Sequence, residues 1–409
     1  MASNPPFPPE AASAGIASPT LPVERYRRNR RSELAIWWRE IDRGLLLLVL
    51  MLMAIGTVAV AAASPASAHR LSTSKETLGD LHFFLLHVRW QIIGLAVMFT
   101  TSLLSKDAAR RLAILLAAAV LIALMLVPIV GSEVNGARRW LNVGVTIQPS
   151  EFLKPTFAVA LAWILSWSVR DHNLPVVGIS VILTGLIAGL LMLQPNFGAT
   201  ILFCGVWFVL ILLLGLSLRR IMVTGAVGVG LLTAIYIFYD NARYRIDAFL
   251  GGGTAFDQVD LAQRTLLNGG WTGTGFWLGQ RKMSLPEAHT DYIFSVIGEE
   301  FGLIACAVII VLYLALLVRV LFRLIDEEDL FTVLAGAGLA AQLGGQAFIN
   351  IMVNLQLFPS KGMTLPLISY GGSSTIALCL GVGLLVAITR RNPFIERERF
   401  SLSDIGVSS

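Results

Sequence analysis

Apolar stretches of about twenty residues recur along most of this 409-residue chain, and they restrict its fold more than any other feature. A helix of that length crosses the hydrocarbon core of a bilayer. The composition agrees, because 56% of the residues are hydrophobic and only 14% are charged, whereas soluble domains are about a quarter charged. We therefore expect an all-α membrane protein, a polytopic bundle of transmembrane helices.

Ten spans are predicted, and they divide the chain into a membrane domain and two tails. Residues 1–43 form a tail rich in proline, alanine and arginine that we expect to be disordered, residues 44–389 form the domain, and residues 390–409 form the second tail. A large loop, 240–290, separates the seventh and eighth spans. The predicted spans are 44–64, 86–104, 112–130, 150–168, 174–193, 197–216, 221–239, 291–318, 331–355 and 366–389.

Lysine and arginine gather in alternate loops, which predicts how the chain lies across the membrane. By the positive-inside rule the side that carries them is cytoplasmic, and an even number of spans puts both tails there. The net charge of +5 is ordinary for such a protein and gives no reason to expect a nucleic-acid partner. The loop cations on this side are Lys106, Arg110, Arg111, Arg170, Arg219, Arg220, Arg319, Arg323, Arg390 and Arg391.

The opposite, outer side receives most of the motif-like sequence, and several cations there run against the charge bias. Anchoring to lipid headgroups explains any one of these cations. A cluster of them is better explained by an anionic partner at the outer membrane surface. The cations concerned are Arg138, Arg139, Lys154, Arg281, Lys282 and Lys361.

Asp291 stands at the mouth of the eighth span, at the end of the run Pro286-Glu-Ala-His-Thr-Asp291. It could simply cap the helix. Partial desolvation at the edge of the hydrocarbon raises the pKa of a carboxylate, however, and that suits a general base acting on a sugar hydroxyl. Glu287 and His289 alternate with Asp291, so an extended segment could turn all three toward a divalent cation, although a hydrogen-bonded loop histidine is the simpler interpretation.

Three further groups of polar residues allow both structural and functional interpretations. Glu299 and Glu300, about two turns inside the eighth span, could hydrogen-bond to a neighbouring helix or contact a substrate. Glu151 and Lys154 lie three apart on one helix face, which predicts an ion pair or a lysine held for phosphate. The stretch 362–374, which includes Ser369, could form a broken or tightly packed helix or line a polar cavity.

Together these stretches resemble the SEDS family (shape, elongation, division and sporulation) of polytopic peptidoglycan glycosyltransferases. The resemblance runs from the first span to the last, and the last two motifs look like the division branch of the family more than the elongation branch. The motifs that carry it are Asn135-Gly-Ala-Arg-Arg-Trp140, Gln148-Pro-Ser-Glu-Phe-Leu-Lys154, Gln194-Pro-Asn-Phe-Gly198, Leu285-Pro-Glu-Ala-His-Thr-Asp291 with Gly298-Glu-Glu-Phe-Gly302, and Lys361-Gly-Met-Thr-Leu-Pro-Leu-Ile-Ser-Tyr-Gly-Gly-Ser-Ser374.

The resemblance implies polymerisation of lipid II at the outer face of a bacterial cytoplasmic (inner) membrane during septal division. Asp291 matches the family's essential aspartate. Asn196 stands where the family often has Asp, which leaves a catalytic carboxylate there in doubt, although an asparagine could hydrogen-bond a sugar. The residues that we expect to contact substrate are Arg139, Lys154 and Lys361, which match basic cavity residues, together with Glu151, Asn196, His289, Glu287 and Ser369.

The resemblance also implies a class B penicillin-binding protein, a transpeptidase, as partner, with other divisome membrane proteins. A divalent cation, Mg²⁺ or Mn²⁺, could assist the reaction, but no metal ligands are predicted. Three alternatives stay open from the sequence: a lipid II flippase, a scaffold for the penicillin-binding protein, and the elongation-type paralogue.

Overall fold

The computed structural model describes residues 33–73, 77–134, 137–142, 144, 146–169, 171, 173–215, 218–239, 243, 246–247, 251, 258–359 and 362–391. Ile41–Arg391 form one compact unit. The short helix α2 (Glu33–Glu40) belongs to the other unit. Most of each predicted tail falls outside the described residues, as does much of the first part of the predicted loop 240–290.

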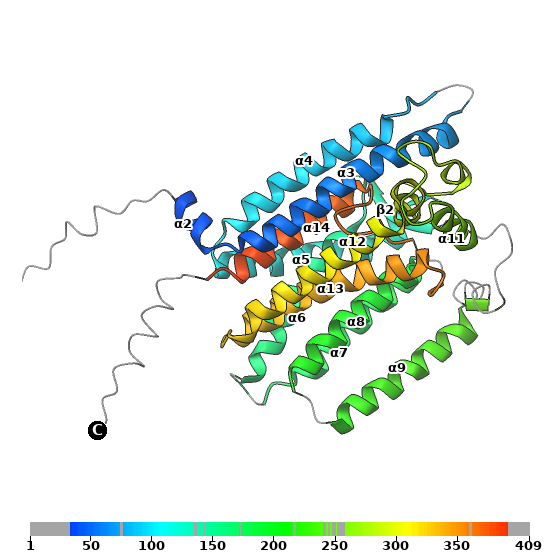
Figure 1. The fold of residues 1–409 in the computed structure, drawn as a ribbon. Helices are drawn as coiled ribbons and strands as arrows, with labels where there is room; N and C mark the ends of the chain where they lie inside the picture. The colour runs from blue at the N-terminus through cyan, green and yellow to red at the C-terminus, as the bar shows by residue number, and fades with distance from the viewer. Residues whose placement is uncertain are drawn as a thin grey trace, which may run out of the picture. The chain divides into compact units, whose positions relative to one another are not determined.

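Within the described part of the chain, ten apolar helices build the compact unit, and each corresponds to one predicted span. Figure 1 shows how these helices are arranged. Three are shorter or less apolar: α8 (Phe197–Leu213), α9 (Leu218–Phe238) and α14 (Gly372–Ile388). The predicted all-α membrane bundle is thereby confirmed. Seven helices are long and apolar enough to cross a bilayer, namely α3 (Arg43–Leu71), α4 (His82–Ser102), α5 (Lys106–Val130), α6 (Pro149–Ser166), α7 (Val176–Leu193), α12 (Ile293–Ile325) and α13 (Leu330–Asn354).

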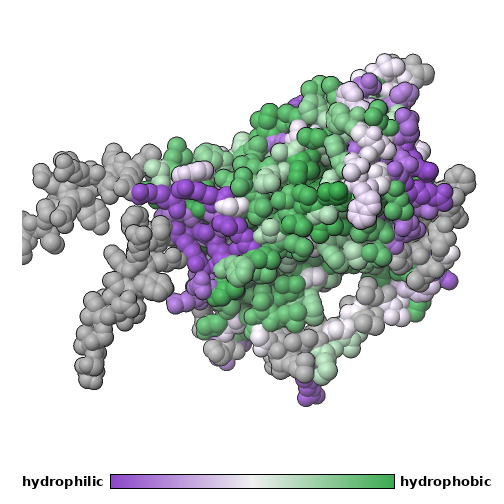
Figure 2. All heavy atoms as spheres, in the orientation of Figure 1, coloured by the Kyte–Doolittle hydropathy of each residue, from purple (hydrophilic) through white to green (hydrophobic). Residues whose placement is uncertain are grey.

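Apolar and hydrophilic surfaces separate along the helices, as a bundle in a bilayer requires. Figure 2 shows apolar atoms over the middle of the visible face and hydrophilic atoms toward both ends of the helices. At one end, Asp42 before α3 pairs with Arg319 at 2.6 Å and with Arg323 at 3.5 Å. Arg323 also donates to the carbonyl of Thr389, 2.7 Å away, just after α14. The first and last spans therefore begin and end at the same end, as an even number of spans requires.

The opposite end carries short elements that the sequence analysis did not predict. Three strands, β1 (Ser132–Val134), β2 (Ala137–Asn142) and β3 (Thr146–Ile147), pair antiparallel in the order β1-β2-β3. The described part of the predicted loop 240–290 contains helix α11 (Gln258–Asn268) and the short 3₁₀ helix η2 (Arg281–Ser284). The last span was predicted to begin at residue 366, but α14 begins at Gly372, because residues 362–371 form irregular chain that packs at this end.

Helix α12 is broken at Gly302, where φ is +82°. Such a break leaves amides and carbonyls that need partners inside a membrane protein. Residues 270–275 supply them: the amides of Leu303 and Ile304 donate to the carbonyls of Gly270 and Trp271 at 3.0 and 3.3 Å. In the other direction, the amides of residues 274 and 275 donate to the carbonyls of residues 299 and 300 at 2.8 and 3.0 Å.

Glu299 and Glu300, just before this break, hold the preceding loop onto α12. Both are buried, with 0% and 1% exposure. Glu299 accepts hydrogen bonds from the side-chain amide of Asn268 at 2.9 Å and from the backbone amides of Arg281 and Lys282 at 2.8 and 2.9 Å. Glu300 pairs with the buried ammonium group of Lys282. Of the two interpretations given above, the geometry supports the structural one, since neither glutamate lines the cavity described below.

The break at Gly302 generates a first prediction. The substitution Gly302→Ala should lower the free energy of unfolding by about 1–3 kcal/mol, because a non-glycine residue is strained at positive φ. The added Cβ would also lie 2.3 Å from the carbonyl oxygen of Trp271. Equilibrium unfolding of the purified protein in detergent micelles measures this loss.

Gly205→Ala in α8 is the matched control. A Cβ there meets no atom within 4 Å, and alanine favours a helix over glycine, so the free energy of unfolding should be unchanged or slightly higher. Equal stability of the Gly302→Ala and wild-type proteins would contradict the account of the break.

Candidate active site

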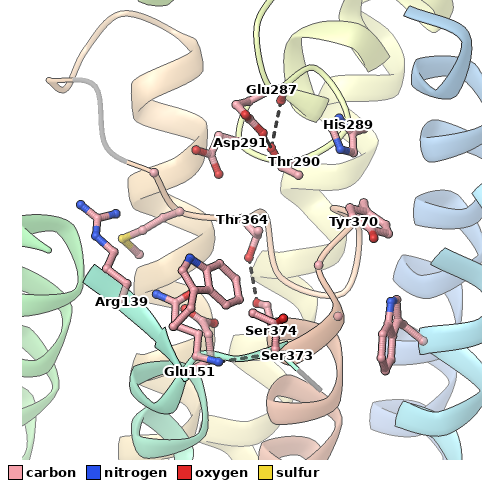
Figure 3. A pocket seen from close by; sticks show the side chains of 18 residues that line it. Arg139, Glu151, Glu287, His289, Thr290, Asp291, Thr364, Tyr370, Ser373 and Ser374 are labelled. Atoms are coloured by element: carbon pink, nitrogen blue, oxygen red, sulfur yellow. Dashed lines mark hydrogen bonds between the residues drawn. The ribbon is translucent and has the colours of Figure 1, made fainter. Parts of the chain in front are cut away.

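A cavity of about 710 Å³ lies at the end of the bundle that carries the strands (Figure 3). Its walls come from α4, from β2 and β3, from the start of α6, from the segment before α12 and from the segment that leads into α14. The structure brings five of the predicted site residues together in its lining: Asp291, Arg139, Glu151, Glu287 and His289.

Three other predicted substrate contacts lie behind the cavity wall and do not line it. Lys154 is 3% exposed and Ser369 is 4% exposed. Asn196 caps α8, with its side-chain oxygen 3.4 Å from the amide nitrogen of Ala199. These three residues support the segments around the cavity, and their side chains are not part of its described lining. Lys361 lies outside the described residues.

The loop that carries Asp291 is fixed through its main chain by the segment that leads into α14. The carbonyl of His289 accepts from the amide of Tyr370 at 3.0 Å. The next carbonyl, that of Thr290, accepts from the hydroxyl of Ser369 at 2.6 Å. Ser369, predicted to contact substrate, therefore joins two walls of the cavity.

The carbonyl of Asp291 itself is held by α13. The side-chain amides of Asn350 and Asn354 donate to it at 2.8 and 3.1 Å. Three successive carbonyls are thus bound on the inner side of the loop, and the half-buried side chain of Asp291 lines the cavity.

Helix capping does not explain Asp291. The residue at the cap position of α12 is Tyr292, whose side chain makes no capping hydrogen bond, and the first-turn amide of Ser295 donates to the side-chain oxygen of Asn354 at 3.2 Å. Instead, the carboxylate of Asp291 lies against Gly362, where an added Cβ would be 3.3 Å from its Oδ2 atom. Asp291 thus lines the cavity, which is the position that a general base acting on a bound molecule requires.

His289, Glu287 and Asp291 do not converge on one point. The imidazole Nδ1 of His289 shares a 2.7 Å hydrogen bond with the hydroxyl of Ser67, and its ring packs on Phe83 at 4.3 Å. Glu287 accepts a 2.8 Å hydrogen bond from the hydroxyl of Thr290 (Figure 3). The simpler interpretation, a hydrogen-bonded loop histidine, is confirmed. Among the described residues no group of three His, Cys, Asp or Glu side chains could hold a metal ion.

Burial sets the protonation of this histidine. It lowers the pKa of His289 from 6.5 to about 4, so the ring is neutral near neutral pH. A neutral ring can share its Nδ1 hydrogen bond with Ser67 without placing a charge in the wall of the cavity.

Glu151 and Lys154 form the predicted ion pair at the start of α6. Pro149 occupies the first turn, which suits a residue without an amide hydrogen. The Lys154 ammonium lies 2.6 Å from the Glu151 carboxylate and 3.1 Å from the side-chain oxygen of Gln346. Because Lys154 is buried and Glu151 lines the cavity, a molecule in the cavity meets the carboxylate first.

Arg139 is the only lysine or arginine among the described residues that line the cavity. Strand β2 carries it, and the turn before α8 holds it: its Nε atom donates to the carbonyl of Gln194 at 3.0 Å, and its Nη2 atom to that of Pro195. The guanidinium is half-buried, so its charge is both fixed in place and accessible from the cavity.

Several lining residues were missed by sequence reasoning or left undecided. Trp90 in α4 gave no signal, because an aromatic residue in an apolar span is ordinary. Trp140 and Gln148 stand in motifs quoted above without a role of their own. For the segment 362–374, polar lining is confirmed, since Thr364, Ser373 and Ser374 line the cavity. The hydroxyls of Thr364 and Ser374 lie 2.9 Å apart.

Comparison with known proteins agrees with these motifs. The family model FtsW/RodA/SpoVE, described as a cell cycle protein, matches residues 43–393, which is most of the chain. The chain belongs to this family.

Two relatives within the FtsW/RodA/SpoVE family illustrate matches over nearly the whole length of the relative. A Caulobacter vibrioides protein (strain NA1000 / CB15N) named "Probable peptidoglycan glycosyltransferase FtsW" is 35% identical over 370 residues, covering 90% of this chain and 94% of the relative. A Coxiella burnetii protein (strain RSA 493 / Nine Mile phase I) with the same name is 31% identical over 364 residues, covering 85% of this chain and 95% of that protein. The resemblance to a division-type SEDS protein is thereby confirmed.

Solved structures share the fold. A chain from "Structural coordination of polymerization and crosslinking by a peptidoglycan synthase complex" is 30% identical with a TM-score of 0.70, and the match covers 88% of this chain and 98% of that one. The rod shape determining protein RodA of Thermus thermophilus is 29% identical with a TM-score of 0.62, covering 86% of this chain and 97% of that one.

The buried histidine generates a second prediction. The unfolded state binds a proton near pH 6.5 whereas folded His289 does so only near pH 4, so stability is lost as pH falls between these values. The free energy of unfolding that His289 removes in this way is about 3 kcal/mol at pH 4 or below, and it is close to zero above pH 6.5. The variant His289→Asn should lack this part of the pH dependence, as measured by unfolding in detergent at pH 7 and pH 4.5.

His69→Asn is the control, because it removes an exposed histidine of the same chain and so shows whether the effect is specific to the buried His289. An equal loss of stability in the wild-type and His289→Asn proteins would show that His289 is not the titrating group.

Proposed function

We propose that this chain is an FtsW-type peptidoglycan glycosyltransferase that polymerises lipid II at the outer face of the bacterial cytoplasmic membrane during septal division. One observation carries the proposal: the Asp291 carboxylate lines a cavity of about 710 Å³ while its main chain is fixed by α13. The names of the curated relatives support the same reaction.

The cavity suits the two-part chemistry of lipid II, a disaccharide-peptide on a polyprenyl pyrophosphate. Its tail stays in the bilayer while its sugars extend beyond it, and a cavity at one end of a membrane bundle can receive the sugars. In this orientation the strand end of the bundle faces outward and both tails are cytoplasmic, as the distribution of loop cations predicts.

In the proposed reaction, Asp291 is the general base. The 4-hydroxyl of the acceptor GlcNAc loses its proton to the carboxylate as its oxygen attacks the anomeric carbon of the growing glycan. The bond from that carbon to the polyprenyl pyrophosphate breaks, and the electron pair leaves with the pyrophosphate. One displacement turns an α-linked donor into a β-linkage, so a single base is sufficient and no covalent enzyme intermediate is needed.

The departing pyrophosphate needs positive charge, and Arg139 supplies it at the cavity surface. In the proposal Lys154 acts indirectly, by neutralising Glu151 from behind, while Lys361, beside Gly362 in the sequence, adds a second cation. A divalent cation, Mg²⁺ or Mn²⁺, stays part of the proposal. No step is routed through it, because the described cavity residues offer no set of three ligands.

Crosslinking of the new strands requires a partner, and we include a class B penicillin-binding protein with other divisome membrane proteins in the proposal. A similar chain comes from a structure described as a peptidoglycan synthase complex that coordinates polymerization and crosslinking. The sequence shows no transpeptidase motif of its own ahead of a soluble domain.

A third prediction tests the function. Purified protein in liposomes, with and without the partner, is given labelled lipid II, and glycan strands are separated by size. The wild type should form polymer, and Asp291→Asn should lose about 10²–10⁴-fold in rate, the usual contribution of a general base. Asp326→Asn at the opposite end is the control, because the Asp326 side chain is 75% exposed and its only described ion pair is a 3.8 Å contact to Arg391.

The same liposomes separate the rival functions. Transfer of lipid II between leaflets without polymer would identify a flippase, and polymer at the wild-type rate from Asp291→Asn would rule out the assigned base. Equal thermal unfolding of the three proteins shows that the comparison concerns chemistry and not folding.

A further inference from the structure

One face of α13 carries four amide side chains in a row. Gln342, Gln346, Asn350 and Asn354 are spaced four residues apart, which places them along the same side of the helix. Their exposures are 3%, 0%, 2% and 0%. Burying a side-chain amide in a membrane helix is costly unless it is hydrogen-bonded. The hydrogen-bond partners of these four amides therefore indicate which parts of the structure they hold.

Gln346 connects two walls of the cavity. Its side-chain oxygen accepts from the ammonium of Lys154 at 3.1 Å, and Lys154 in turn holds Glu151. Its side-chain nitrogen donates to the carbonyl of Thr364 at 3.0 Å. The start of α6 and the segment before α14 are thereby tied to the same point of α13.

Asn350 connects the next two segments. Its side-chain nitrogen has two hydrogens, and it donates to the carbonyl of Asp291 at 2.8 Å and to that of Met363 at 2.7 Å. Asn354 adds a second bond to the Asp291 carbonyl at 3.1 Å and accepts from the hydroxyl of Ser295 at 2.7 Å. The amide of Asn350 is thus the direct bridge between the loop before α12 and the segment 362–364.

This bridge fixes how the Asp291 carboxylate is aimed. The bridged carbonyl belongs to Asp291 itself, so only two rotatable bonds separate the fixed main chain from the carboxylate. On the other side of the bridge, Gly362 precedes Met363, and an added Cβ at Gly362 would lie 3.3 Å from Asp291 Oδ2. A change in the spacing of the two segments therefore moves the carboxylate relative to the wall it lies against.

We propose that Asn350 is a positioning residue for glycan polymerisation: its amide sets the spacing between the Asp291 loop and segment 362–364, and so places the carboxylate against the acceptor hydroxyl. The inference rests on the proposed function. Asn350 does not line the cavity, so it acts through Asp291 and not on the substrate.

This role makes a fourth prediction with a specific kinetic signature. Asn350→Leu keeps the size of the side chain but loses both donors, and it should lower kcat about 100-fold, the cost of a misplacement near 1 Å. KM for lipid II should stay within about twofold, because the side chain touches no substrate. The assay is the liposome polymerisation described above, run over a range of lipid II concentrations.

A second variant keeps the test open if Asn350→Leu fails to fold. Asn350→Asp has the same shape, and its new carboxyl can donate one hydrogen bond when protonated and none when ionised. Its kcat should therefore fall as the pH rises through the pKa of that carboxyl, a descending limb that the wild type lacks. A residue needed only for stability would lower the amount of folded protein without adding such a limb.

Gln342→Leu is the matched control. Gln342 is a buried amide on the same face, two turns away, and it bonds to Gln346 at 3.4 Å. Its replacement should leave kcat and the pH profile unchanged. An active wild type with unchanged kcat in both Asn350 variants, or a rise in KM in place of the fall in kcat, would overturn the inference alone. A wild type that makes no polymer would instead overturn the proposed function, and the inference with it.

Discussion

The base of the Asp291 loop depends on how the chain satisfies backbone groups where α12 is broken. The break at Gly302 separates a short helical piece, 293–301, from the long span that follows. Residues 270–275 fill the open hydrogen bonds, and Glu299 and Glu300 bind the loop amides around them. The short piece is therefore held firmly from outside, and the loop at its start, which carries Asp291, has a rigid base.

The Asp291 loop has a second support, and the side chains that provide it are uncharged. At the opposite end of the bundle, the ends of helices are joined by ion pairs such as Asp42 with Arg319. Around the Asp291 loop the joints are amides and a hydroxyl: Asn350, Asn354 and Ser369. A cation in their place would stabilise the charged carboxylate and make it a weaker base, whereas an amide fixes the main chain without adding charge.

The membrane helices could be predicted from the sequence because the thickness of the bilayer dictates the length of an apolar span. Each of the ten predicted spans corresponds to a helix in the described part of the chain. Five predicted site residues also came together, since their motifs all fall on one side of the membrane. Local pattern could not show that Lys154 is turned inward, because that depends on Gln346, 192 residues away. The strands were missed, although the pair Asn135-Gly136 between β1 and β2 is a known hairpin signal. The break in α12 was missed because a lone glycine in an apolar run carries no such signal.

Ion pairing also changes the argument that the cations of the outer side attract an anionic substrate. The sequence places six cations on the cavity side, yet Lys154 and Lys282 are buried against glutamates. Arg139 faces the cavity, whose described lining also carries the carboxylates of Glu151, Glu287 and Asp291. Among the described lining residues, Arg139 alone attracts a pyrophosphate, while the carboxylates of Glu287 and Asp291 repel it and accept hydrogen bonds from hydroxyls. In the proposed reaction this uneven charge orients the substrates, with pyrophosphate toward the β2 wall and the acceptor sugar toward the Asp291 loop.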